Sequence, residues 1–156
     1  MGMEQVGILV AIPASVFVLL ALTYKLLPRG GDFLVVLAFA AMLLISLGVA
    51  ADYTAHVHDG HFAAEGANAF AFDWINIAHG HFLIQFSTWV DAITVVMIVV
   101  VSTVALMVAF YSMSYMHGEP RYGWYFGALS LFVTAMLMLV VSGNLLQLYV
   151  AWEGVG

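Results

Sequence analysis

Long apolar stretches separated by short polar connections dominate the chain. Four of them are long enough to cross a bilayer core, which takes about 20 residues in helical conformation. They are Gly7–Leu27, Phe33–Ala51, Ala92–Met113 and Gly123–Val141. We therefore expect an all-α, multi-span membrane protein with four complete transmembrane helices.

The segment between the second and third apolar stretches follows a different pattern. Asp52–Asp91 contains five of the six histidines and neither Lys nor Arg, so it is too polar to lie in lipid. Phe72–Ile77 and Phe82–Ser87 are rich in β-forming residues, and Ala78–His81 between them has the composition of a turn. This pattern predicts a β-hairpin on the outer surface, preceded by an irregular segment over Asp52–Ala71.

The same pattern divides the chain into three parts. Residues 1–51 would form the first two transmembrane helices, and residues 52–91 the outer loop with its hairpin. Residues 92–156 would form the third and fourth transmembrane helices and the start of a fifth.

Composition narrows the functional classes. Hydrophobic residues make up 65% of the chain and charged residues 8%, whereas a soluble domain has about 25% charged residues. The net charge of −6 leaves no basic surface for nucleic acid. The chain has no cysteine for thiolate-bound iron–sulfur clusters, and neither a Gly-x-Gly-x-x-Gly turn after a strand nor a P-loop. We expect no cofactor on this chain, so redox chemistry would belong to other chains.

The few basic residues predict the orientation in the membrane. Lys25 and Arg29 lie between the first two spans, and Arg121 lies between the third and fourth. Positively charged connections stay on the cytoplasmic side. The N-terminus and the segment Asp52–Asp91 are therefore expected outside, and the Val- and Ala-rich spans favour a bacterial inner membrane.

The end of the sequence carries the start of another helix. Ser142–Asn144 is a turn-like break, and only 13 residues remain from Asn144 to Gly156, fewer than the roughly 20 needed to cross. A terminal half-helix would leave carbonyl groups unsatisfied in hydrocarbon. We therefore expect these residues to be the front of a longer protein.

Glu153 is the candidate functional residue. It follows Asn144 by nine residues, which places it about 13 Å into a core roughly 30 Å thick. An acid there costs about 2.5–3.5 kcal/mol unless it takes up a proton or finds a partner, so acids at this depth are typical of proton relays. The alternative is a structural glutamate that holds neighbouring helices together.

Two other groups of polar residues have more ordinary interpretations. Asp91 precedes the third span and is expected to cap that helix. His56, His58 and His61, with Asp52 and Asp59, could bind zinc or copper. Ligands this closely spaced in an outer loop more often bind metal adventitiously, so we expect no functional metal site.

The second half of the sequence resembles a known family. The segments that carry the resemblance are Tyr115–Tyr122, Leu129–Phe132, Asn144–Leu148 and Trp152–Gly156. They resemble the antiporter-like L-type subunit of NADH:quinone oxidoreductase, respiratory complex I, over its N-terminal portion. The large subunit of multisubunit cation/proton antiporters shares much of this pattern.

The resemblance implies a proton-translocating subunit with neighbouring antiporter-like membrane subunits as partners. Glu153 aligns with a family glutamate that pairs with a lysine two spans further on, beyond Gly156. Quinone chemistry elsewhere in the complex would drive the proton transfer. Two alternatives stay open: a sodium/proton antiporter or membrane-bound hydrogenase subunit, and a non-conducting scaffold in which Glu153 only joins helices.

Overall fold

The computed structural model describes residues 6–58, 67–77 and 82–156. The helices and strands in these ranges, in chain order, are α1 (Val6–Thr23), the short 3-10 helix η2 (Pro28–Gly31), α2 (Asp32–His58), β1 (Ala67–Ile77), β2 (Phe82–Val90), α3 (Ala92–Tyr115), α4 (Tyr122–Val140) and α5 (Leu145–Val155).

Helices α1 to α4 form an up-and-down bundle. Helix α1 lies beside α2 and α4, and α3 lies beside the same two helices. Phe39, Met42, Phe126 and Leu9 are fully buried between them. All four helices are long and apolar enough to span a membrane, which confirms the prediction of a multi-span helical membrane protein.

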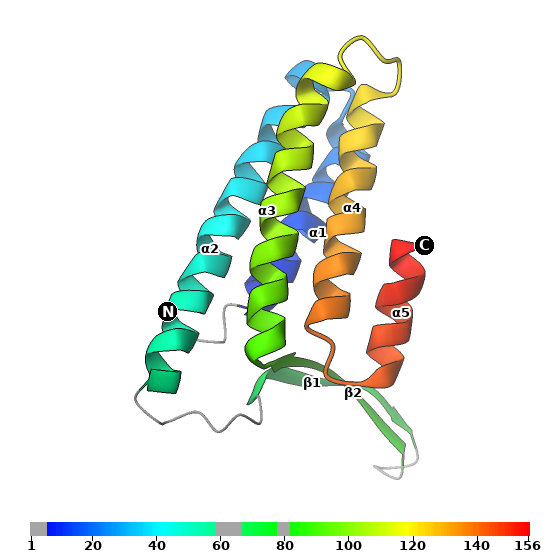
Figure 1. Cartoon of the computed structure of the whole chain (residues 1–156). Coiled ribbons are helices and arrows are strands. Elements are labelled where there is room, and N and C mark those ends of the chain that lie inside the picture. The colour runs from blue at the N-terminus through cyan, green and yellow to red at the C-terminus, as the bar shows by residue number, and fades with distance from the viewer. Residues whose placement is uncertain (1–5, 59–66, 78–81) are drawn as a thin grey trace.

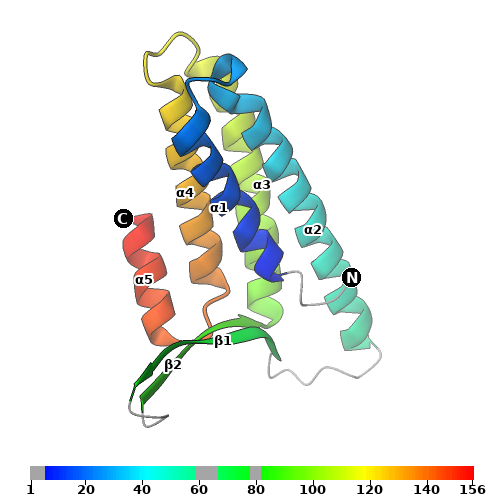
Figure 2. The ribbon, with the colours of Figure 1, turned by 180° about the vertical axis from the view of Figure 1, so that it is seen from behind.

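The two ends of the bundle differ in character (Figures 1 and 2). The β-hairpin lies across one end, and the α1–α2 and α3–α4 connections lie together at the other. Lys25 and Arg121 belong to these connections, and so does Arg29, which lies within η2. All the basic residues of the chain are therefore grouped at the end opposite the hairpin.

The expected boundary of the second helix was wrong. Helix α2 continues past Ala51 to His58, and β1 begins at Ala67. The irregular segment expected over Asp52–Ala71 is thus helical at its start and extended at its end, while residues 59–66 lie outside the described residues. Hydropathy indicates where lipid contact ends, whereas an established helix adds further residues at little cost.

The predicted hairpin is confirmed for both of its strands. Strands β1 and β2 pair antiparallel with Asp73 opposite Gln85, and Gln85 Nε2 donates a hydrogen bond of 2.9 Å to Asp73 Oδ1. The expected turn at residues 78–81 lies outside the described residues. Both strands are longer than the sequence pattern indicated.

The connection between α4 and α5 is bonded to strand β2. Trp89 N donates to Val141 O and Gly143 N donates to Ser87 O, each at 2.9 Å, and Thr88 forms an isolated bridge with Ser142. A Cβ on Gly143 would collide with Ser87, so this close approach requires glycine. The hairpin is thereby fixed to the point where α5 begins.

Candidate functional site

The start of α5 is defined by one side chain with two roles. Asn144 Oδ1 accepts a hydrogen bond of 2.8 Å from Gln147 N, which caps the free amides of the first turn. Asn144 Nδ2 donates to Gln85 O at 2.6 Å. The predicted break before a helix starting at Asn144 is confirmed, and the same residue ties that helix to the hairpin.

Gln147 is a buried contact that sequence analysis missed. The residue is 1% exposed, and its Oε1 accepts a hydrogen bond of 3.1 Å from Ser87 N. Within the described part of the chain, its Nε2 has no hydrogen-bond partner. A Gln among Leu residues in the first turn of a helix was the available signal, because such a residue needs a polar neighbour when it is buried.

Helix α5 brings Glu153 back alongside α4. A Cβ on Gly154 would lie 3.1 Å from the Cβ of Ala135, so the absence of a side chain at Gly154 lets the two helices approach closely. Figure 1 shows α5 ending about halfway along α4. Glu153 therefore lies level with the apolar interior of the bundle and away from either end.

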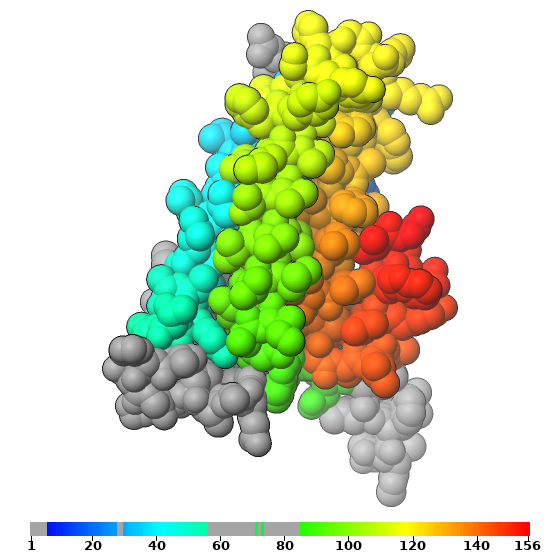
Figure 3. Space-filling model, in the orientation of Figure 1, coloured from blue at the N-terminus to red at the C-terminus, as the bar shows by residue number. Residues whose placement is uncertain are grey.

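The surface around Glu153 is open on the side facing away from α4. Figure 3 shows α5 standing at the flank of the bundle. Glu153 is exposed, as are its helix neighbours Tyr149 and Trp152, which are 54% and 59% exposed. Among the described residues, α4 is the helix that α5 packs against.

The basic side chains of the described bundle are remote from Glu153. Lys25 and Arg121 are exposed at the end opposite the hairpin, whereas α5 starts at the hairpin and stops midway. A cation that pairs with Glu153 would therefore come from residues other than those described.

A buried acid, unlike the exposed Glu153, lies at the end that carries the basic residues. Asp32 is 2% exposed in the first turn of α2, and its Oδ2 accepts a hydrogen bond of 2.7 Å from the Tyr122 hydroxyl. Nearby, the hydroxyls of Ser112 and Tyr125 lie 2.8 Å apart and share a hydrogen bond. Sequence analysis did not identify Asp32, because its position between Gly31 and an apolar run resembles an ordinary helix start.

The histidine cluster is only partly described. His56 and His58 lie in the last turn of α2, while Asp59 and His61 lie outside the described residues. Among the described residues, no group of three His, Asp or Glu side chains is placed to hold a metal ion.

Comparisons with known proteins identify related sequences. Residues 74–126 match the family described as NADH-ubiquinone oxidoreductase (complex I), chain 5 N-terminus. An NADH-ubiquinone oxidoreductase chain 5 of Acanthamoeba castellanii is 54% identical over 66 residues, covering 42% of this chain and 10% of the relative. A chloroplastic NAD(P)H-quinone oxidoreductase subunit 5 of Mesostigma viride is 37% identical over 118 residues, covering 76% of this chain and 18% of the relative. The chain thus spans less than one fifth of the length of these curated relatives.

Proposed function

We propose that this chain, a relative of complex I subunit 5 over that subunit's N-terminal portion, acts in a proton-translocating membrane subunit of an NADH:quinone oxidoreductase. The family match over residues 74–126 and the four membrane-length helices support this proposal. The chain would conduct protons, and NADH oxidation and quinone reduction would take place on other subunits.

Glu153 is the proposed proton-binding carboxyl. The observation that carries this assignment is the position of α5, which returns along α4 through the contact of Gly154 with Ala135. That contact supports a location for Glu153 within the hydrocarbon layer, where an acidic side chain needs a proton or a partner. Movement of the cation toward and away from Glu153 would then drive release and uptake of the proton.

The structure also supports a proposal for the orientation of the chain in the membrane and for its partners. The grouping of Lys25, Arg29 and Arg121 at one end supports a cytoplasmic location for that end, with the N-terminus and hairpin outside. The partners would be other membrane subunits of the complex, foremost neighbouring antiporter-like subunits, in a bacterial inner membrane. The exposed face of α5 supports a further helix as its neighbour, because without such a helix Glu153 would lie against lipid.

The decisive experiment replaces Glu153 in the full-length protein within its complex. Glu153→Gln keeps the size and hydrogen-bonding capacity of the side chain but cannot release a proton. We expect proton pumping per NADH oxidised to fall, while the complex still assembles and still reduces quinone. Glu153→Asp, which keeps a carboxyl, should retain part of the pumping.

A matched control and a rival interpretation complete the test. Asp73→Asn removes an acid from the hairpin but keeps an oxygen to accept the hydrogen bond from Gln85, so pumping should be unchanged. If Glu153 only joins helices, Glu153→Leu would leave pumping intact and stabilise the assembly, as replacement of buried charges can. Full pumping by both Glu153→Gln and Glu153→Leu would reject the proposed role.

A further inference from the structure

Asp32 is a buried carboxyl that has no part in the role proposed for Glu153. It is 2% exposed and lies at the start of α2, one of the membrane-length helices. Its Oδ1 accepts a hydrogen bond from Phe33 N and its Oδ2 accepts one from the Tyr122 hydroxyl, each at 2.7 Å. Among the described side chains, no cation contacts this carboxyl. A buried acid needs a proton or a partner, so Asp32 is a candidate for proton binding.

Two glycines hold Asp32 beside Tyr122. A Cβ on Gly30 would lie 2.8 Å from the Cα of Gly123, and a Cβ on Gly123 would lie 3.2 Å from the Gly30 oxygen. Gly30 also has a φ of 62°, a conformation that other residues rarely adopt. The connection before α2 therefore lies directly against the start of α4, and this contact brings the carboxyl to the hydroxyl.

The Tyr122 hydroxyl lies between two acceptors. Its oxygen is 2.7 Å from Asp32 Oδ2 and 3.3 Å from Met113 O. Met113 belongs to the last turn of α3, where carbonyl groups lack partners within the helix. A hydroxyl has one hydrogen to donate, and the shorter distance assigns that hydrogen to Asp32. When Asp32 takes up a proton, the hydroxyl hydrogen is free to turn to Met113 O instead.

A hollow of about 320 Å³ adjoins Tyr122 at the same end of the bundle. Its lining comes from both connections at this end, with Tyr24 and Gly30 from one and His117 and Pro120 from the other. His117 and Pro120 are exposed, so the hollow opens to the surface. Imidazole is a frequent proton carrier in proteins. Tyr122 is thus shared by an open hollow that contains a histidine and by the contact with the buried carboxyl.

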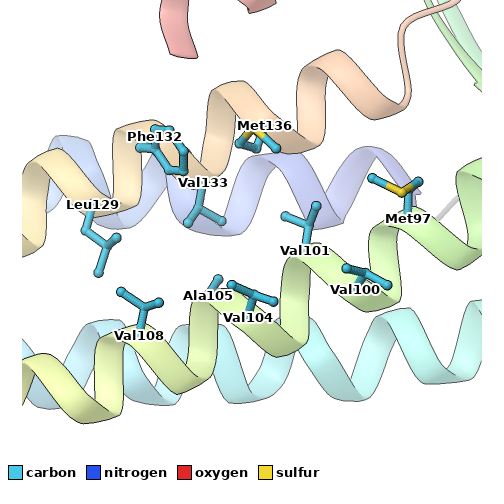
Figure 4. Close-up of a pocket in the computed structure, with 10 residues that line it drawn as sticks. All are labelled: Met97, Val100, Val101, Val104, Ala105, Val108, Leu129, Phe132, Val133 and Met136. Carbon is cyan, nitrogen blue, oxygen red and sulfur yellow. The ribbon is translucent and has the colours of Figure 1, made fainter. Parts of the chain in front are cut away.

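The apolar groove between α3 and α4 offers no such groups. Figure 4 shows its ten lining residues, all of which have aliphatic, aromatic or thioether side chains. None of these side chains binds or releases a proton. The contacts of Asp32, and not this groove, therefore support proton exchange.

The other titratable and charged residues at this end lie on, or directly beside, the elements that pack against α2. These elements are α1, η2, α3 and α4. The residues are Tyr24, Lys25, Arg29, Tyr111, Tyr115, His117, Glu119, Arg121 and Tyr125. Apart from Arg29, whose side chain is not among those described, the charged residues and the histidine of this set are exposed. Tyr122 is therefore the described titratable group that contacts Asp32.

We propose that Asp32 is a second proton-binding carboxyl, which exchanges protons with the hollow through the Tyr122 hydroxyl. A proton from solvent or from His117 binds the Tyr122 oxygen while the hydroxyl hydrogen passes to Asp32 Oδ2. One O–H bond forms and one breaks at Tyr122, and one O–H bond forms at Asp32, so a single proton enters and no electron moves. Tyr122 then donates to Met113 O, and release follows the reverse order. The part that this proton takes in pumping rests on the proposed function.

The inference is tested by infrared difference spectroscopy of the full-length protein within its complex. Spectra before and after addition of NADH are recorded with carboxyl-labelled and with unlabelled aspartate, so that aspartate bands are identified. We expect a band of neutral aspartic acid that changes during turnover and is lost in Asp32→Asn. Asn keeps the size of the side chain and an oxygen for the Tyr122 hydrogen bond, so the complex should still assemble and reduce quinone.

Two tyrosine variants separate proton transfer from packing. Tyr122→Phe removes the hydroxyl between the hollow and Asp32. It should slow the change of the Asp32 band by about a hundredfold, as expected for loss of a positioned proton donor. Tyr125→Phe, the matched control, removes a hydroxyl at the same end that shares a hydrogen bond of 2.8 Å with Ser112. Its band should change as fast as in the unaltered protein.

Glu153→Gln, measured in the same way, distinguishes this inference from the role proposed for Glu153. Full pumping by Glu153→Gln, together with an Asp32 band that changes during turnover, would reject that role and support this inference. Identical spectra of the unaltered protein and Asp32→Asn would overturn the inference. Equal slowing by Tyr122→Phe and Tyr125→Phe would also overturn it, because the effect would then come from the packing of this end.

Discussion

The side-chain oxygen of Gln147 accepts a hydrogen bond of 3.1 Å from the backbone amide of Ser87, joining the first turn of α5 to the last part of the hairpin. Both residues are buried, with Gln147 1% and Ser87 9% exposed. The bond adds to those that Asn144 and Gly143 make with the same strand. The hairpin and α5 are therefore a single unit, and the position of Glu153 depends on it.

Replacement of Gln147 by Leu should destabilise this unit. The change keeps the volume of the side chain but leaves Ser87 N buried and unsatisfied, at a cost of about 1–3 kcal/mol. Loss of the unpartnered Nε2 offsets part of that cost. The measurement is thermal unfolding of the full-length protein in detergent, with Gln147→Glu as the comparison because its oxygens can still accept the bond. A Gln147→Leu protein as stable as the unaltered one would mean that this contact is not formed.

The hydrogen bond from Tyr122 to Asp32 gives a second prediction. Tyr122→Phe removes the donor to a buried carboxyl that is 2% exposed. Loss of a hydrogen bond to a charged or buried group of this kind costs about 1.5–3 kcal/mol. We expect a lower midpoint of thermal unfolding, whereas Tyr111→Phe, at a site 65% exposed, should leave the midpoint unchanged. If Tyr122→Phe and Tyr111→Phe have the same midpoint of thermal unfolding, the hydrogen bond from Tyr122 to Asp32 does not stabilise the fold.

Sequence patterns predict the local features of this fold well. The four spans follow from hydropathy, and the cap at Asp91 follows from a short polar residue before an apolar helical run. The break before α5 was predicted at Ser142–Asn144, although the capping role of Asn144 was not. The spans and the cap depend on residues within a few positions of one another. The hairpin is predicted for the same reason, since alternation is visible within each strand.

The contacts that fix the candidate site are not local. Gln147 meets Ser87, and Tyr122 meets Asp32, across separations of 60 and 90 residues. In neither pair does the sequence around one residue indicate which residue is its partner, so these contacts cannot be predicted from a single sequence. The end of α2 was missed for a different reason: Asp52–His58 is polar but still helical, and hydropathy does not distinguish a helix outside the membrane from a loop.

The cap of α3 predicts a pH dependence of stability. The hydrogen bond from Thr94 N, at 2.7 Å, holds the pKa of Asp91 below its ordinary value of 3.8. A carboxyl whose pKa is lower in the folded protein stabilises the fold above the unfolded-state pKa. This contribution disappears as the pH falls through the lowered value.

Asp91→Asn should therefore change the acid limb of the stability profile. Asn caps a helix nearly as well as Asp but does not titrate in this range, so Asp91→Asn should lose less stability than the unaltered protein as the pH falls below about 4. Asp91→Ala removes the cap and should cost about 1 kcal/mol at neutral pH. The free energy of unfolding, measured across pH, checks both. Parallel profiles for the unaltered protein and the Asp91→Asn variant would contradict the assignment.

The contact between Gly154 and Ala135 predicts a rescue experiment for the position of Glu153. A Cβ at residue 154 would lie 3.1 Å from the Cβ of Ala135, closer than two methyl groups pack without strain. Gly154→Leu should push α5 away from α4, shift Glu153 and lower proton pumping. Ala135→Gly opens space on α4, so the double variant should recover part of the lost pumping, whereas Ala128→Gly, which opens space elsewhere on α4, should not. If only the double variant with Ala135→Gly recovers pumping, pumping depends on the packing of α5 against α4. If Gly154→Leu lowers pumping equally alone and with either second substitution, that explanation is excluded.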